Sequence, residues 1–163
     1  MGDTESMDAE RAQPVRHVGV PRSVIRALGR PGVAEPTDGG RPLLVVDAAN
    51  VVGSVPDGWW RDRAGATERL RDGLVRIAEN GVPGWTAEPP LDVVLVVEGA
   101  ARGVRGVAGV EVVAAAGVGD DAVVELVRAA GRPCAVITAD RELRARVTEL
   151  GAEVLGPRSV RPD

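Results

Sequence analysis

The sequence contains no lysine, tyrosine or phenylalanine, and it has a single histidine and a single cysteine. Because all 20 basic residues are arginine, a P-loop, which needs its lysine, and Schiff-base chemistry on a lysine are both excluded. The one histidine, His17, precedes the first expected strand and leaves little scope for a histidine triad or a zinc site; we expect it to be exposed. The lone thiol of Cys134 excludes internal disulfides, and its apolar neighbours indicate a buried residue. The chemistry left to this chain belongs to carboxylates, arginines, hydroxyls and bound metal.

Long apolar runs are also missing from the 163 residues, so we expect no membrane span. Residues 1–10 are acidic and polar, unlike a secretory signal, and a cytoplasmic protein with one domain and one core is the expectation. The net charge of −4 provides no overall attraction to nucleic acid. Any contact with phosphate must therefore be local, a role that suits the planar fork of arginine.

The composition divides the chain into three parts. Residues 1–40 are rich in glycine, proline and charge, and they predict a flexible N-terminal arm with a short helical stretch at 23–28. We favour plain disorder of this arm over a docking role. Residues 41–157 carry the regular patterns of a folded domain, and residues 158–163 form a polar tail.

Apolar runs alternate with amphipathic stretches throughout the domain. Branched aliphatic runs without polar alternation are typical of parallel strands covered by helices on both faces. They predict strands at 43–46, 93–97, 110–115, 135–138 and 153–155. Helical spacing of apolar residues predicts helices over 62–79, after Gly119 and after Asp140. The alternation indicates a single α/β domain with a mostly parallel sheet and right-handed crossovers.

Acidic residues stand where the expected strands end or the expected helices begin. Asp47 and Glu98 each follow an apolar run directly, and we expect neither to cap a helix. Three other acids are expected at helix starts, where capping alone could explain them: Asp120, Asp121 and Asp140. Since parallel strands end at the same edge of a sheet, all five should converge there. Carboxylates about 4 Å apart repel by roughly 4 kcal/mol at an effective dielectric near 20, so the cluster predicts a hard divalent cation, Mg²⁺ or Mn²⁺.

Four short motifs follow one another in a characteristic order between residues 43 and 156. They are Val-Val-Asp47-Ala-Ala-Asn50, Val-Val-Glu98-Gly, Gly119-Asp120-Asp121 before a helix, and Ile137-Thr138-Ala139-Asp140-Arg141-Glu142-Leu143. In this order they resemble the motifs of the PIN-like superfamily, most closely its NYN-type ribonucleases. The resemblance implies a five-stranded parallel sheet in the order 3-2-1-4-5 and metal-dependent cleavage of RNA.

The resemblance also implies roles for individual residues. The metal-binding acids would be Asp47, Asp140 and one of the Asp120-Asp121 pair, with Glu98 as the fourth; of the pair we prefer Asp120. Asn50 matches an amide near the scissile phosphate. Thr138 matches a hydroxyl beside the last acid, where it would hold a carboxylate or water. Many relatives carry a glycine and an aromatic where this chain has Ala48-Ala49, so base stacking at that point has no support.

Other candidates have two readings each. Arg102 and Arg105, on a glycine-rich loop after Glu98, would clamp phosphate or be plain solvated side chains. Arg141 would pair with a carboxylate or face the substrate. The adjacent Trp59 and Trp60 would stack on bases, but packing at a helix entrance is the reading we favour.

We therefore expect a metal-dependent ribonuclease that hydrolyses phosphodiester bonds of RNA. One alternative is a catalytically silent PIN-like module that binds RNA or protein. Another is a phosphatase or nucleotide hydrolase, which is disfavoured because Ala49 stands where an aspartyl phosphatase has its second aspartate. The RNA, the choice between internal and terminal cuts, and the oligomeric state, including a homodimer, stay open.

Overall fold

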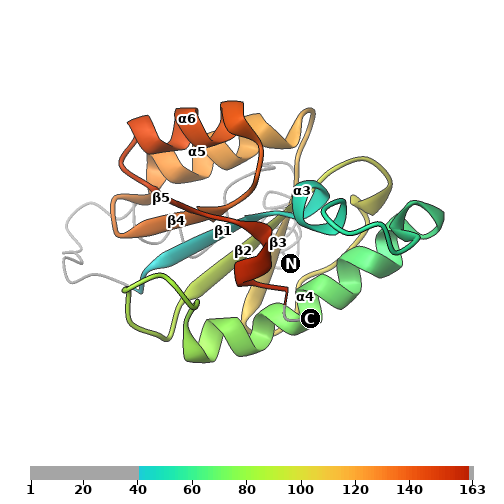
Figure 1. Cartoon of the computed structure of the whole chain (residues 1–163), viewed down its shortest axis with the longest axis horizontal. Helices are drawn as coiled ribbons and strands as arrows, with labels where there is room; N and C mark the ends of the chain where they lie inside the picture. The colour runs from blue at the N-terminus through green and yellow to red at the C-terminus, as the bar shows by residue number, and fades with distance from the viewer. Residues whose placement is uncertain (1–40, 162–163) are drawn as a thin grey trace, which may run out of the picture.

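A computed structural model describes residues 41–161, so the expectations for His17 and the N-terminal arm lie outside the described residues. The chain forms three layers, with a five-stranded sheet between two layers of helices (Figure 1). The strand order is β3-β2-β1-β4-β5, and every pair of neighbouring strands is parallel. The predicted fold class and strand order are both confirmed.

The strands lie where the aliphatic runs predicted them, with ends that differ by at most one residue. Their bounds are β1 Leu43–Asp47, β2 Asp92–Val97, β3 Val110–Ala114, β4 Cys134–Ile137 and β5 Glu153–Leu155. At the centre, Val45 of β1 is in register with Val94 of β2 and Val136 of β4. All three side chains are fully buried, because helices cover both faces of these strands. This double burial explains why the runs show no polar alternation.

Four α-helices and three short 3₁₀ turns connect the strands of the described chain. The helices are α3 Ala48–Val52, α4 Arg63–Asn80, α5 Gly119–Ala130 and α6 Arg141–Glu149. The 3₁₀ turns are η1 Trp59–Arg61, η2 Gly99–Ala101 and η3 Pro157–Ser159. Helix α3 was not predicted, since its alanines and valines continue the aliphatic run of β1 with no loop between them.

Each face of the sheet has its own hydrophobic core. Helices α5 and α6 cover one face, whereas α3 and α4 lie on the other (Figure 1). Leu74 of α4 is fully buried against this second face, beside Leu44 and Leu95. Burying a leucine side chain contributes about 1.5–3 kcal/mol. In the described part of the chain, no helix has the length and apolarity that a membrane crossing requires.

The C-terminal segment packs more closely than a polar tail would. Val160 is 3% exposed and belongs to the core beside α3 and α4. Arg161 donates a hydrogen bond of 3.0 Å to the carbonyl of Val51 and lies 3.5 Å from the Asp57 carboxylate. The packed domain therefore includes residues beyond 157, because the Val160 side chain covers the core.

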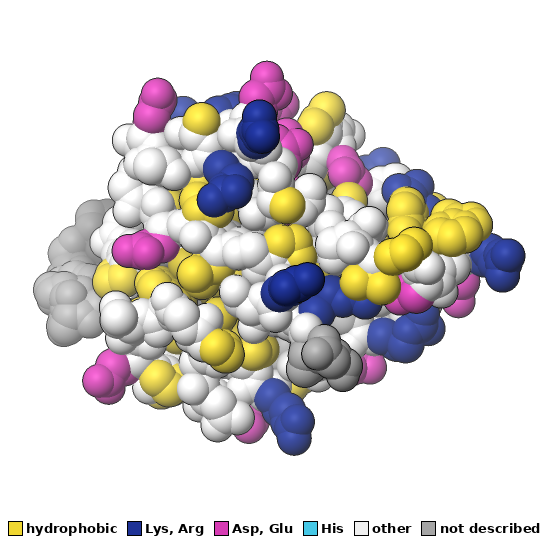
Figure 2. Space-filling view, in the orientation of Figure 1, with side chains coloured by type: hydrophobic (Ala, Val, Ile, Leu, Met, Phe, Trp, Pro, Cys, Tyr) yellow, Lys and Arg dark blue, Asp and Glu magenta, His cyan; other side chains and the backbone are white. Residues whose placement is uncertain are grey.

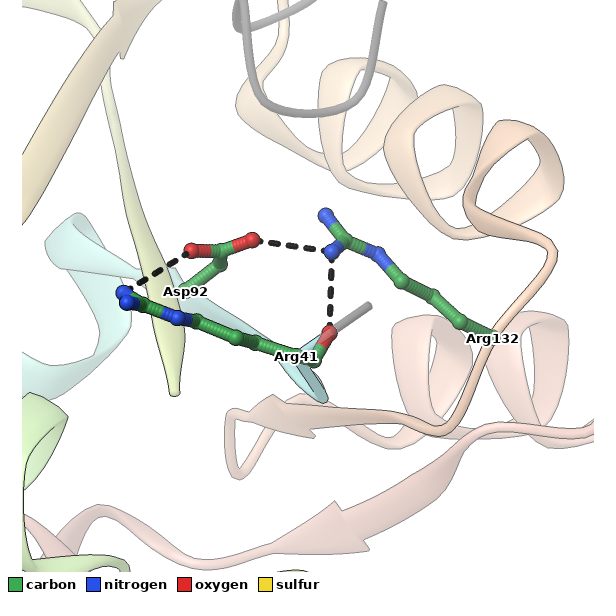
Figure 3. A network of polar contacts seen from close by, with 3 residues as sticks. All are labelled: Arg41, Asp92 and Arg132. Carbon is green, nitrogen blue, oxygen red and sulfur yellow. Dashed lines mark hydrogen bonds and ion pairs between the residues drawn. The ribbon is translucent and has the colours of Figure 1, made fainter. Parts of the chain in front are cut away.

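A buried arginine joins the amino ends of three strands (Figure 3). The side chain of Arg132 is 7% exposed, and its Nη1 donates to Asp92 Oδ2 and to the carbonyl of Arg41, at 2.8 Å each. Arg41 adds a longer ion pair, 3.9 Å, to the same carboxylate. This network holds the sheet at the edge opposite the expected acidic site.

Candidate acidic site

Asp47 lies at the junction of β1 and α3 and is 6% exposed. Its Oδ1 accepts a 3.4 Å hydrogen bond from the amide of Asn50, and its Oδ2 accepts one of 3.2 Å from the hydroxyl of Thr138. Burial raises the pKa of Asp47 to about 6, and the nearby carboxylates of Asp120 and Glu98 add to the rise, against the effect of the two hydrogen bonds. At neutral pH the Asp47 carboxylate is therefore charged, although its burial makes the charged form unfavourable.

Thr138 links Asp47 to the acid that follows β4. Its hydroxyl donates to Asp47 and accepts a 3.1 Å hydrogen bond from the amide of Asp140. Because this side chain is fully buried and both its contacts are protein groups, Thr138 positions the acids, and its hydrogen bond to Asp47 is the contact with a carboxylate that the resemblance implied. Asp140 in turn accepts from the amide of Leu143 at 2.9 Å and caps α6. One hydroxyl therefore brings together two acids that are distant in the sequence.

Asn50 joins the same arrangement from α3. Its Oδ1 accepts a 2.7 Å hydrogen bond from the amide of Ala139, in the loop between β4 and α6. Its side-chain NH₂ has no hydrogen-bond partner among residues 41–161. The half-buried Asn50 therefore keeps a donor for a bound group.

Glu98 follows β2 and is held by the first residue of α5. Its Oε1 accepts a 2.8 Å hydrogen bond from the amide of Gly119. A Cβ at Gly119 would lie 3.3 Å from the Glu98 carboxylate carbon, so a glycine allows this close approach. This pairing was not predicted, and the glycine ahead of Asp120 was the one available signal.

The two neighbouring acids of α5 have different surroundings. Asp120 is half-buried, and its pKa is raised by burial and by the carboxylates of Asp140 and Glu98, while Arg146 lowers it. Asp121 is exposed and lies 3.3 Å from the Arg146 guanidinium. Of the pair, Asp120 is the one coupled to the other acids.

The expected division between capping acids and free acids is wrong. Asp47 caps α3, because that helix begins directly after β1, and Glu98 accepts the first amide of α5. By contrast, α5 has Val118 as its N-cap residue and no side-chain cap. Asp120 and Asp121 thus lie in the first turn without capping it, and Asp140 alone of the predicted caps has that role.

The acids suit a hard cation by their chemistry but do not yet form a ligand set. Within residues 41–161, no three His, Cys, Asp or Glu side chains are arranged so that they could hold a metal ion. The oxygen atoms of their carboxylates are nevertheless the ligands that Mg²⁺ and Mn²⁺ prefer. Burial and then the charges of neighbouring carboxylates raise the pKa values of Asp47 and Asp120, so a cation bound here would favour their charged forms.

The predicted arginines stay apart from the acids. The side chains of Arg102, Arg105 and Arg141 are exposed, and none has a hydrogen bond or ion pair with a described residue. A different arginine, Arg63, lines a small pocket together with Glu98 and Trp59. Arg63 was not predicted as a site residue, although it follows the tryptophan pair at the start of α4.

No family model and no curated protein matches this sequence. Among solved structures, the chain is similar to Rae1 (YacP) from Bacillus subtilis, with a TM-score of 0.58. The two share 19% identical residues, and the match covers 73% of this chain and 72% of that one. The two chains share a fold. At this identity the similarity concerns the fold alone, so the roles of residues in this domain must come from its own geometry.

Proposed function

We propose that this PIN-like domain hydrolyses phosphodiester bonds of RNA in a metal-dependent reaction at the acidic site. The observation that supports it most is the link from Asp47 through Thr138 to Asp140, with Asp120 coupled to the same group. The charges of Glu98 and Asp120 act on Asp47, and those of Asp140 and Glu98 act on Asp120, so these carboxylates destabilise one another unless a cation binds. The fold similarity to Rae1 is consistent with this proposal and adds no residue roles.

Asp47, Asp120 and Asp140 would hold the ion, with Glu98 beside them. A bound divalent cation supplies Lewis acidity, which lowers the pKa of water and stabilises the charge that develops on phosphate oxygens. Binding requires side chains to turn, because the carboxylates do not form a set of three ligands as they stand.

The remaining polar groups of the site orient the substrate and the acids. The free NH₂ of Asn50 donates to a phosphate oxygen, while its Oδ1 stays on the Ala139 amide. The amide of Gly119 holds Glu98 Oε1, which leaves Oε2 to accept a proton from the attacking water. The Arg63 guanidinium, in the pocket next to Glu98, attracts the RNA backbone.

The test is cleavage of a single-stranded RNA by purified protein in Mn²⁺, comparing wild type with Asp47→Asn. We expect Asp47→Asn to lower the rate by about 100-fold or more, because the central anchor of the cation loses its charge. The matched control is Asp72→Asn, an exposed acid of α4 paired with Arg71, which should cleave at the wild-type rate. Equal cleavage by wild type and Asp47→Asn would refute the proposal.

The second candidate is a silent PIN-like module that binds RNA without cutting it. It is favoured by one observation, the lack of a ready set of three metal ligands among residues 41–161. For such a module we expect RNA binding that is unchanged by a chelator, and no cleavage in Mg²⁺ or Mn²⁺.

A further inference from the structure

Turn η1 carries two tryptophans with contrasting surroundings. Their ring centroids are 5.9 Å apart, with the rings nearly perpendicular at 85°. Trp59 is half-buried, and a Cβ at Gly53 would lie 3.7 Å from its ring, so packing accounts for its place. Trp60 is 54% exposed. Packing therefore explains the first tryptophan of the pair but leaves the second without a structural reason.

An arginine accompanies each ring. The guanidinium carbon of Arg61 lies 5.9 Å from the Trp60 centroid, and that of Arg63 lies 5.3 Å from the Trp59 centroid. Neither guanidinium forms an ion pair with a carboxylate in the described part of the chain. The rings thus hold two positive charges that form no ion pair with an acid of residues 41–161.

These four residues, which we call the tryptophan platform, adjoin the acidic site. Trp59 and Arg63 line the same small pocket as Glu98. A Cβ at Gly99, the residue after Glu98, would lie 3.7 Å from Arg63 Nη1. Figure 2 shows hydrophobic side chains gathered at the end of the molecule where the loop between α3 and α4 lies, with arginine side chains around them. An exposed aromatic surface, positive charge and the acidic site are therefore continuous.

We propose that the tryptophan platform binds single-stranded RNA, with an unpaired base stacked on Trp60 and the neighbouring phosphates bound by Arg61 and Arg63. This inference rests on the proposed function, since it takes RNA as the ligand. Any base offers a flat face to an aromatic ring, whereas in a duplex both faces of an internal base are already stacked. Local positive charge is also what a chain of net charge −4 requires in order to bind phosphate. The platform makes the domain selective for unpaired RNA.

The test measures binding separately from cleavage. Asp47→Asn protein in a chelator is titrated against a fluorescently labelled single-stranded oligonucleotide, and fluorescence polarisation gives the Kd. Adding Trp60→Ala should raise the Kd by about 5- to 150-fold, as expected for the loss of one stacked base. Trp60→Phe, which keeps a ring, should recover much of the affinity. A duplex of the same sequence should bind weakly and respond little to Trp60→Ala.

The control is Leu150→Ala, at the end of α6 away from Asp140, because Leu150 is another exposed apolar residue, 39% exposed. It should leave the Kd unchanged. A Trp60→Ala Kd within twofold of its parent, equal binding of duplex and single strand, or no RNA binding by the parent would overturn the platform. So would a parent protein that is dimeric and that Trp60→Ala makes monomeric, because that surface would then serve self-association.

The two proposals fail in different ways. If Asp47→Asn cleaves as well as wild type while Trp60→Ala loses affinity, the platform stands and the nuclease proposal falls. If Asp47→Asn abolishes cleavage while Trp60→Ala binds normally, the nuclease stands and the platform falls.

Discussion

At the scale of single residues, the hydroxyl of Thr138 determines where two acids lie. It donates to Asp47 and accepts from the amide of Asp140, and it is fully buried. Its donation to Asp47 also lowers the pKa of that carboxyl, against the larger effect of burial. A hydroxyl without access to solvent therefore influences both the geometry and the charge of the site.

Thr138→Val tests this role, because valine has the same shape without the hydroxyl. We expect the free energy of unfolding to fall by about 1–3 kcal/mol, since the buried Asp47 carboxylate and the partly buried amide of Asp140 lose their hydroxyl partner. The pKa of Asp47 should rise above 6, and the pH at which Mn²⁺-dependent cleavage reaches half its maximum should rise with it. Urea unfolding and the pH profile of cleavage measure the two effects.

Thr138→Ser is the control for that substitution, because it keeps the hydroxyl and should retain the wild-type pH profile. A Thr138→Val protein with reduced stability and an unmoved pH profile would limit Thr138 to a packing role.

At the scale of elements, three helices begin at the acidic site. The amides of Asn50, Gly119 and Leu143, in the first turns of α3, α5 and α6, donate to Asp47, Glu98 and Asp140 respectively. Backbone amides at helix starts are otherwise unpaired, and they stabilise negative charge. The structural and the functional interpretations of these acids are therefore compatible. Glu98 and Asp140 each accept through one oxygen and can offer the other to a ligand. Both oxygens of Asp47 accept a hydrogen bond, and each keeps a second lone pair for a ligand.

Gly119→Ala tests whether the start of α5 must approach Glu98 closely. The new Cβ would lie 3.3 Å from the carboxylate carbon, so Glu98 has to shift by a few tenths of an ångström. We expect cleavage to fall by about tenfold, given that misplacement by 1 Å costs about 100-fold. A single-turnover cleavage assay measures the change.

The matched control is Gly73→Ala, in the exposed middle of α4, where a Cβ would meet nothing within 4 Å. It should raise the free energy of unfolding by about 0.5–1 kcal/mol and leave cleavage unchanged. Cleavage that falls equally in both variants would mean that the approach of Gly119 to Glu98 has no special role.

The burial of each element explains how far the sequence predicts it. The five strands and three long helices were predictable because aliphatic runs and helical spacing record burial directly. Helix α3 was not predictable, because Ala48–Val52 continues an aliphatic run and the change of conformation depends on the cap made by Asp47. The hydrogen bond between Glu98 and Gly119 was not predictable either, since it depends on where β2 and α5 lie relative to one another. The acids of the site were predictable as a set, whereas their hydrogen-bond partners were not.

At the scale of the whole molecule, stabilising and chemical groups occupy opposite edges of the sheet. The Arg132–Asp92 pair, 2.8 Å long, lies at the amino ends of the strands, and the coupled acids lie at the carboxyl ends. In a parallel sheet the two edges are separated by the length of the strands. The hydrophobic cores and the Arg132–Asp92 pair therefore stabilise the fold away from the edge where the charges of the acids destabilise it.

The cost of that charge predicts how stability depends on pH and metal. Asp47 has a pKa of about 6 in the folded state, against an ordinary value of 3.8, so folding favours its protonated form. In metal-free protein this group's contribution to stability is greatest below pH 4 and falls by about 3 kcal/mol as the pH rises through 6. The difference in unfolding free energy between wild type and Asp47→Asn, measured in a chelator at pH 4 to 8, should follow this curve.

Mn²⁺ should raise the stability of wild type at pH 8 and much less at pH 5, because the ligand must lose its proton first. Asp47→Asn should respond weakly to Mn²⁺ at either pH, and a wild-type protein with an equal response at pH 5 and 8 would place Asp47 outside the metal site.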